Sequence, residues 1–82
     1  MNDWSVYMLR CADDTLYTGI AKDLSARLVT HNAGKGAKYT RARRPVHLVW
    51  SEAAEDRSAA TKREIAIKKL NRARKLALIS QN

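Results

Sequence analysis

The chain has 82 residues, which suits one small domain over residues 1–82 and leaves no room for a second core. With 45% hydrophobic residues it is too apolar for a disordered tail, and its apolar runs are too short for a membrane-spanning helix. The single cysteine, Cys11, excludes an internal disulfide and a structural zinc site, and the N-terminus lacks a secretory pattern. We therefore expect a cytoplasmic protein.

Basic residues give the strongest compositional signal. Sixteen Lys and Arg against eight Asp and Glu leave a formal net charge of +8. Most of this excess lies in two clusters, residues 35–44 and residues 62–75. Two such clusters on a small domain indicate a nucleic-acid partner, although a basic surface that serves only solubility has the same composition.

The N-terminal third predicts a β-hairpin. Residues alternate between two faces from Ser5 to Cys11, and Thr15–Ile20 is rich in Thr and Tyr, with Gly19 marking the end of this second strand. Asp13-Asp14 between them favours a turn. The two strands are therefore expected to pair antiparallel.

The rest of the chain predicts helices around a third strand. Asp23 can cap a helix that runs to about Asn32, and a glycine-containing basic loop follows over Lys35–Arg44. Pro45 blocks helical continuation before a strand over Val46–Trp50. A last helical region starts near Glu55, and Asn71 can end it and cap a short final helix through Ile79. The pattern predicts a small α/β or α+β domain.

Four side chains that can carry chemistry are predicted to converge. Tyr7 and Tyr17 have the same parity in the hairpin, so they share one face of the sheet, either opposed or diagonal. Arg27 and His31 lie one helical turn apart, beside the leucines expected to face that sheet. Purely structural roles would give the same pattern. The tyrosines could serve only for packing, Arg27 could lay its stem over the core, and His31 could lie near a helix C-terminus for its favourable charge.

Glu64 interrupts an otherwise cationic segment. It shares the apolar side of Ala60 and Ile67 on the predicted helix. From spacing alone it is either an ion-pair partner of its basic neighbours or a ligand for Mg²⁺, which often takes one or two carboxylates.

An ordered set of residues runs through these elements: Val6-Tyr7-Met8, Tyr17-Thr18-Gly19, Arg27, His31 and Glu64. This set resembles the GIY-YIG nuclease superfamily, and Gly34–Arg41 followed by Pro45-Val46 resembles its small stand-alone bacterial members. The resemblance covers roughly Trp4 to Ile79. For the fold, it implies a three-stranded antiparallel sheet flanked by helices. For the activity, it implies hydrolysis of a phosphodiester bond in DNA with one divalent metal, Mg²⁺ or Mn²⁺.

The resemblance also implies a role for each residue. Glu64 would bind the metal, and Arg27 would stabilise charge on the phosphoryl oxygens. Tyr17, or Tyr7 beside it, would accept the proton of the attacking water, and His31 could share that role. Because a free phenol loses its proton only near pH 10, this step requires positive charge nearby.

The chain departs from the family pattern at several positions. The first tripeptide has Val6 and Met8 where the family has Gly and Ile, and Thr18 replaces an aliphatic residue. Ile20 stands where the excision-repair relatives have a lysine, for which Lys22 or Lys38 could compensate. No additional DNA-binding domain accompanies the motifs. Because of these departures, nuclease activity lower than that of the family is an open alternative for this chain.

The basic residues are expected to bind the nucleic-acid backbone without recognising its sequence. DNA is the expected partner and RNA is not excluded, whereas neither a membrane nor a protein partner is indicated. A non-catalytic nucleic-acid-binding module with the same fold is the main alternative, and an adaptor for an acidic protein or ribosomal surface is another. The candidate binding residues are Lys22, Lys35, Lys38, Tyr39, Arg41, Arg43, Arg44, Lys68, Lys69 and Arg72.

Overall fold

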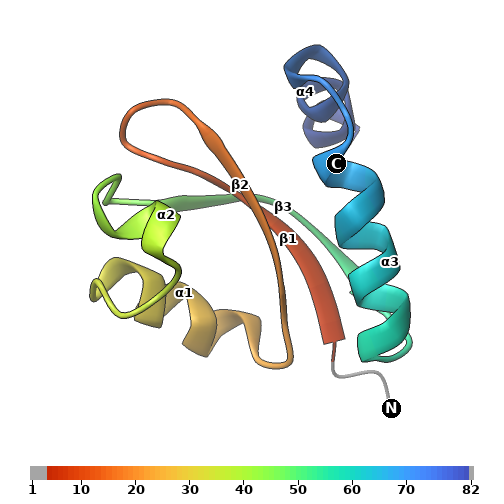
Figure 1. Cartoon of the computed structure of the whole chain (residues 1–82), viewed down its shortest axis with the longest axis horizontal. Helices are drawn as coiled ribbons and strands as arrows, with labels where there is room; N and C mark the ends of the chain where they lie inside the picture. Colours follow the sequence, from red (N-terminus) through yellow and green to blue (C-terminus); the bar gives the residue numbers. More distant parts are fainter. Residues whose placement is uncertain (1–3, 82) are drawn as a thin grey trace.

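An antiparallel sheet of three strands forms the centre of the computed structural model, which describes residues 4–81. The strand order is β2-β1-β3, with β1 (Trp4–Arg10) between β2 (Leu16–Ala21) and β3 (His47–Ala54). Helices cover both faces (Figure 1). On one side lie α1 (Leu24–Asn32) and α2 (Lys38–Arg41), and on the other α3 (Arg57–Lys68) and α4 (Arg72–Ser80). Within residues 4–81, no helix is long and apolar enough to cross a membrane.

The predicted β-hairpin is confirmed, with one correction. The Asp13 carboxylate accepts hydrogen bonds from the backbone N–H and the hydroxyl of Thr15, at 3.2 and 2.6 Å, and Asp14 adopts a left-handed φ of 68°. Gly19 does not end β2, which continues to Ala21, because Gly19 pairs with Tyr7 inside the ladder.

Side-chain caps begin the three longer helices. Asp23 accepts from the Ala26 N–H at 3.1 Å, as predicted, and Asn71 accepts from the Arg74 N–H at 2.9 Å, so the predicted final helix is confirmed. Asp56 caps α3, which places the start of that helix at Arg57 rather than near Glu55.

Two further boundaries differ from the prediction. β3 runs past Trp50 to Ala54, because its pairing with β1 continues through residues of low strand propensity. The basic loop over Lys35–Arg44 contains the short helix α2, which the glycines before it concealed.

The sheet buries a separate cluster on each face. Val6 and Met8 point to α3 and α4 with Trp50, Ala60 and Ile67. The alternate residues of β1 point to the other face, which α1 and α2 cover: Tyr7, Leu9 and Cys11, packed with Ala21 and Val46. The predicted division of β1 residues between two faces is correct, and it places Tyr7 under α1.

Candidate active site

Two tyrosines and a histidine gather on the sheet face below α1. The hairpin register pairs Tyr7 with Gly19 and Leu9 with Tyr17, so the two tyrosines are diagonal neighbours with ring centroids 6.4 Å apart. The ring of His31, from the last turn of α1, lies 6.0 Å from the Tyr7 ring and 5.4 Å from the Tyr17 ring. The predicted convergence of these three side chains is present.

Two glycines make room for this cluster. A Cβ on Gly19 would lie 2.7 Å from the Tyr7 Oη and 2.8 Å from its Cζ, and a Cβ on Gly36 would collide with the His31 ring. A side chain at either position would displace a ring of the cluster. Gly19, the third residue of Tyr17-Thr18-Gly19, is therefore a glycine for a steric reason.

His31 is a buried histidine with both ring nitrogens occupied. It is 0% exposed, its Nε2 lies 2.9 Å from the Tyr7 Oη, and its Nδ1 lies 2.8 Å from the Thr40 Oγ1. Burial, and secondarily the positive charge of Arg27, lowers the pKa of His31. His31 is therefore neutral at pH 7 and has no nitrogen free for a metal or a substrate.

The two tyrosines occupy different environments. Burial raises the pKa of Tyr7, although the Arg27 guanidinium lowers it in part, and Tyr7 is 1% exposed. Tyr7 is thus a neutral phenol that is hydrogen-bonded to His31. Tyr17 is only partly buried and lies in the outer layer of the cluster, where its ring stacks on that of Tyr39 at 5.8 Å.

Glu64 approaches from the opposite layer, on α3. Its side chain is 18% exposed and its carboxylate lies 3.3 Å from the Lys68 Nζ, so the predicted ion pair with a basic neighbour is present. The negative charge of Glu64 also raises the pKa of Tyr7, but less than burial does. The carboxylate is thus within electrostatic range of the cluster but has no hydrogen bond to Tyr7, Arg27 or His31.

Comparison with known proteins assigns the family. Residues 3–77 match the GIY-YIG catalytic domain. The chain belongs to the GIY-YIG family. It is similar to the UPF0213 protein SA0446 of Staphylococcus aureus, with 53% identity over 81 residues that cover 99% of each chain. The predicted resemblance is therefore confirmed.

Two solution NMR structures have the same fold. The UPF0213 protein BH0048 from Bacillus halodurans matches with a TM-score of 0.64 and 41% identity, over 100% of this chain and 86% of that one. The protein EF2693 from E. faecalis matches with a TM-score of 0.65 and 40% identity, over 99% and 90%. The predicted α+β fold is confirmed, and it is the fold of a GIY-YIG nuclease domain.

GIY-YIG nucleases typically use a divalent metal, and the donor set here limits which one fits. Across residues 4–81 no three His, Cys, Asp or Glu side chains are grouped to hold a metal, and both nitrogens of His31 are occupied. A lone carboxylate does not suit zinc, which requires about three or four protein ligands. It does fit Mg²⁺, which keeps several waters and takes phosphate oxygens from a substrate. Glu64 is the residue that fits this role.

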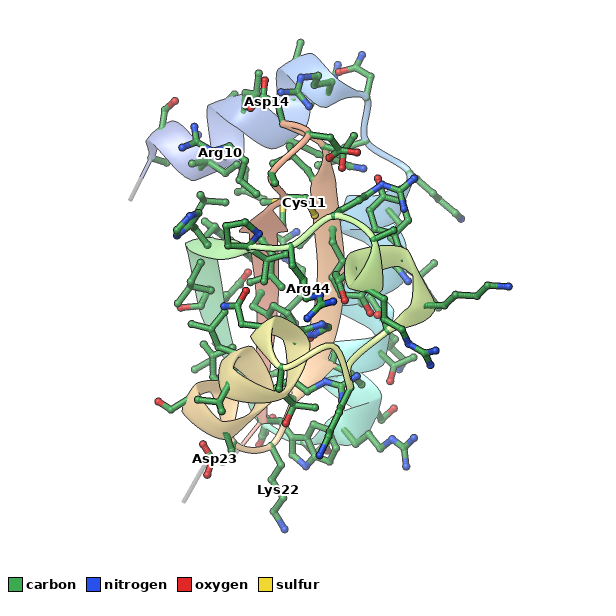
Figure 2. The ribbon with its side chains drawn as sticks, turned by 90° about the vertical axis from the view of Figure 1, so that its left-hand side faces the viewer. Arg10, Cys11, Asp14, Lys22, Asp23 and Arg44 are labelled. Carbon is green, nitrogen blue, oxygen red and sulfur yellow. The ribbon has the colours of Figure 1, made fainter. Side chains whose placement is uncertain are left out.

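The residues predicted to bind nucleic acid fall into two groups. Some already have partners within the chain: Arg43 pairs with Asp13 at 3.0 Å and covers the Tyr39 ring at 4.0 Å, and Arg72 pairs with Asp14 at 3.3 Å. Arg44 lies beside the loop between α1 and α2 (Figure 2). Its guanidinium donates to the carbonyl oxygens of Arg41 and Asn32, at 2.8 and 3.4 Å.

The second group is exposed. Lys22 projects away from the ribbon (Figure 2), and no side-chain partner within residues 4–81 binds it or the other members. These exposed residues are Lys22, Lys35, Lys38, Arg41 and Lys69. Their charges are free to meet an anionic ligand.

Sequence reasoning did not identify Thr40 as part of the site. Thr40 is 0% exposed and contacts His31 from α2, across a loop that contains two glycines. No periodicity connects it to His31, because the contact depends on how the loop folds. Gly36, which packs on the same ring, carries the only local signal.

Proposed function

We propose that this chain is a metal-dependent endonuclease that hydrolyses phosphodiester bonds in DNA, with residues 1–82 acting as one domain. The observation that carries the proposal is the buried hydrogen bond between Tyr7 and His31, with Arg27 beside it. A fixed phenol, a guanidinium and a carboxylate within electrostatic range suit an anionic phosphate and the charge that develops on it.

Arg27 is the residue proposed to bind the phosphate. Its positive charge acts on Tyr7 and on His31, and an arginine presents several donors in a rigid fork that matches phosphate oxygens. Its contribution is greatest in the transition state, in which negative charge on the phosphoryl group is redistributed.

Tyr17 is the residue proposed to accept the proton of the attacking water. Tyr7 is neutral, buried and already directed at His31, so it is the weaker candidate of the two phenols. Tyr17 is the phenol that a substrate can reach, since its side chain is only partly buried. In this proposal His31 holds Tyr7 in place and does not itself contact the substrate.

Glu64 is the residue proposed to hold Mg²⁺ or Mn²⁺. A metal bound there would supply Lewis-acid stabilisation of the scissile phosphate. Because Glu64 is paired with Lys68 in the free protein, Lys68 must release the carboxylate when it serves as a ligand. Lys68 is 54% exposed, so water can take over its side of the pair when the pair separates.

The exposed basic residues are proposed to hold the nucleic-acid backbone. Lys35 lies in the loop before α2, and Lys38 and Arg41 lie on α2 with Tyr39, whose ring stacks on Tyr17. Contacts of this kind position a duplex without reading its sequence, so the binding should be weak and salt-sensitive.

A second candidate is a nucleic-acid-binding module that has lost efficient catalysis. Ile20 favours it: this residue packs against the apolar cluster on the α3 side, where the excision-repair relatives carry a lysine. Cleavage and binding therefore need to be measured separately.

The test is nicking of supercoiled plasmid and of branched DNA by the full chain in Mg²⁺ and Mn²⁺. Glu64→Gln should abolish cleavage, and Arg27→Ala should reduce it by about 100-fold or more. Glu55→Gln changes an exposed glutamate that follows β3; it is the matched control and should cleave like the wild type.

Three outcomes separate the candidates. Wild-type cleavage that Glu64→Gln abolishes supports the nuclease. Salt-sensitive binding without cleavage by any variant supports the binding module. Cleavage that Glu64→Gln retains in full contradicts the role of the carboxylate. An RNA substrate in the same assay distinguishes a general phosphodiesterase from a DNA-selective one.

A further inference from the structure

Thr40 completes a chain of buried hydrogen bonds that starts at Tyr7. Its Oγ1 lies 2.8 Å from the His31 Nδ1 and donates to the Ala37 carbonyl at 2.9 Å. The His31 Nε2 lies 2.9 Å from the Tyr7 Oη. Each hydroxyl and the neutral imidazole carry one proton, so the chain can run in only two directions.

The Ala37 carbonyl decides between the two directions. A carbonyl oxygen only accepts, so the single proton of the Thr40 hydroxyl is donated to Ala37. The Thr40 Oγ1 must then accept the hydrogen bond that joins it to the His31 Nδ1. The proton of a neutral His31 is therefore on Nδ1.

The rest of the chain follows from the position of that proton. Since Nδ1 carries the proton, Nε2 has a free lone pair and accepts from the Tyr7 hydroxyl. The lone pairs of the Tyr7 oxygen are then left for the positive charge of Arg27, which partly lowers the pKa of Tyr7. In the opposite direction Thr40 would donate to His31 and could not donate to the Ala37 carbonyl.

We propose that Thr40 is a positioning residue: it holds His31 as the Nδ1–H tautomer, which makes Tyr7 a donor to His31 and leaves the Tyr7 lone pairs to orient the Arg27 guanidinium for phosphate. The first two steps, the His31 tautomer and the direction of the Tyr7 bond, stand on the geometry. The last step rests on the proposed function.

A hydroxyl suits this position better than a carboxylate. The groups that contact or influence His31 are Tyr7 from β1, Tyr17 from β2, Arg27 from α1 and Thr40 from α2. Arg27 is the only charged one, and within residues 4–81 no carboxylate forms a hydrogen bond with the imidazole. A carboxylate partner would favour imidazolium, which donates from both nitrogens and would turn a donor toward Tyr7. Thr40 fixes the tautomer without adding charge.

The direct test is ¹⁵N NMR of the imidazole in the full chain, with wild type, Thr40→Ser and Thr40→Val. Wild type and Thr40→Ser should show His31 protonated at Nδ1, because both retain the hydroxyl. Thr40→Val removes the acceptor, and His31 should shift toward the Nε2–H form. A wild-type Nε2–H tautomer, or an unchanged tautomer in folded Thr40→Val, overturns the proposal.

Two controls keep this test decisive. The backbone amide spectrum reports whether Thr40→Val is folded, and the wild-type tautomer is informative even if that variant does not fold. Neither measurement requires cleavage, so an inactive protein would contradict the proposed function and leave the tautomer assignment standing.

The effect on Arg27 is tested by a double-mutant cycle. Thr40→Val should lower the cleavage rate by about 10- to 100-fold, with rescue in Thr40→Ser, and should add nothing in an Arg27→Ala background. If wild type does not cleave, the exchange rate of the Arg27 Nε–H replaces activity and should increase in Thr40→Val. Additive losses, or an Arg27 Nε–H that is unchanged, contradict the coupling.

Discussion

Thr18 and Thr40 are both buried, and the same substitution should change stability in opposite directions at the two sites. Thr18, on β2, is 3% exposed, and its Oγ1 is the only fully buried side-chain polar atom within residues 4–81 that lacks a hydrogen-bond partner. Thr40 is 0% exposed and its hydroxyl binds both His31 and Ala37. Valine has nearly the shape of threonine, so neither change opens a cavity.

The expected magnitudes follow from the hydrogen bonds. An unpaired buried hydroxyl costs about 1–3 kcal/mol, and valine also suits a strand, so Thr18→Val should raise the free energy of unfolding by about 1 kcal/mol or more. Thr40→Val leaves the His31 Nδ1–H without an acceptor and should lower that free energy by about 1–3 kcal/mol. In a domain of this size each kcal/mol changes Tm by about 4–8 °C.

Urea unfolding followed by circular dichroism measures both changes, with thermal scans as a second readout. An unchanged m-value in each variant confirms that the folded and unfolded states remain comparable. The reasoning fails if both variants shift in the same direction, because hydrogen-bond pairing would then not be what distinguishes the two sites.

Three further predictions concern packing, pH and salt. Gly19→Ala should lower the free energy of unfolding by about 1–3 kcal/mol in urea, because the added Cβ would displace the Tyr7 phenol; unchanged stability would contradict this. Stability should fall as the pH drops below 6.5, since the pKa of His31 is lowered from that value on folding and the unfolded chain takes up the proton first; this dependence should disappear in folded His31→Gln. In anisotropy titrations, Lys35→Gln should reduce the slope of log affinity against log salt by about 1, and Arg72→Gln should reduce it less because Arg72 is already paired within the chain; equal changes would argue against this distinction.

Local patterns in the sequence were enough to predict much of the fold and part of the site. The parity of Tyr7 and Tyr17 places them on one face whatever the register, and the turn at Asp13-Asp14 leaves little freedom in how the strands pair. The caps Asp23 and Asn71 mark helix starts because a side-chain oxygen there satisfies a backbone donor. These signals depend on neighbours in the chain.

The remaining features depend on tertiary contacts. The short helix α2 follows glycines that usually indicate a loop, and its role is to bring Thr40 over His31. The pairing of Arg43 with Asp13 joins positions 30 residues apart. Sequence alone could count Arg43 as a free charge, but it could not show that the hairpin turn already neutralises it.

The burial of Tyr7 and His31 has a consequence for how this family can diverge. Both residues belong to the interior of the domain as well as to the proposed site, so a lineage that gave up catalysis would still need them for folding. Glu64 is different, because its side chain is partly exposed and its ionic partner among residues 4–81 is an exposed lysine. Drift would therefore remove the carboxylate long before it removed the tyrosine or the histidine. Retention of Glu64, and not of Tyr7 or His31, therefore indicates selection for chemistry in relatives of this chain.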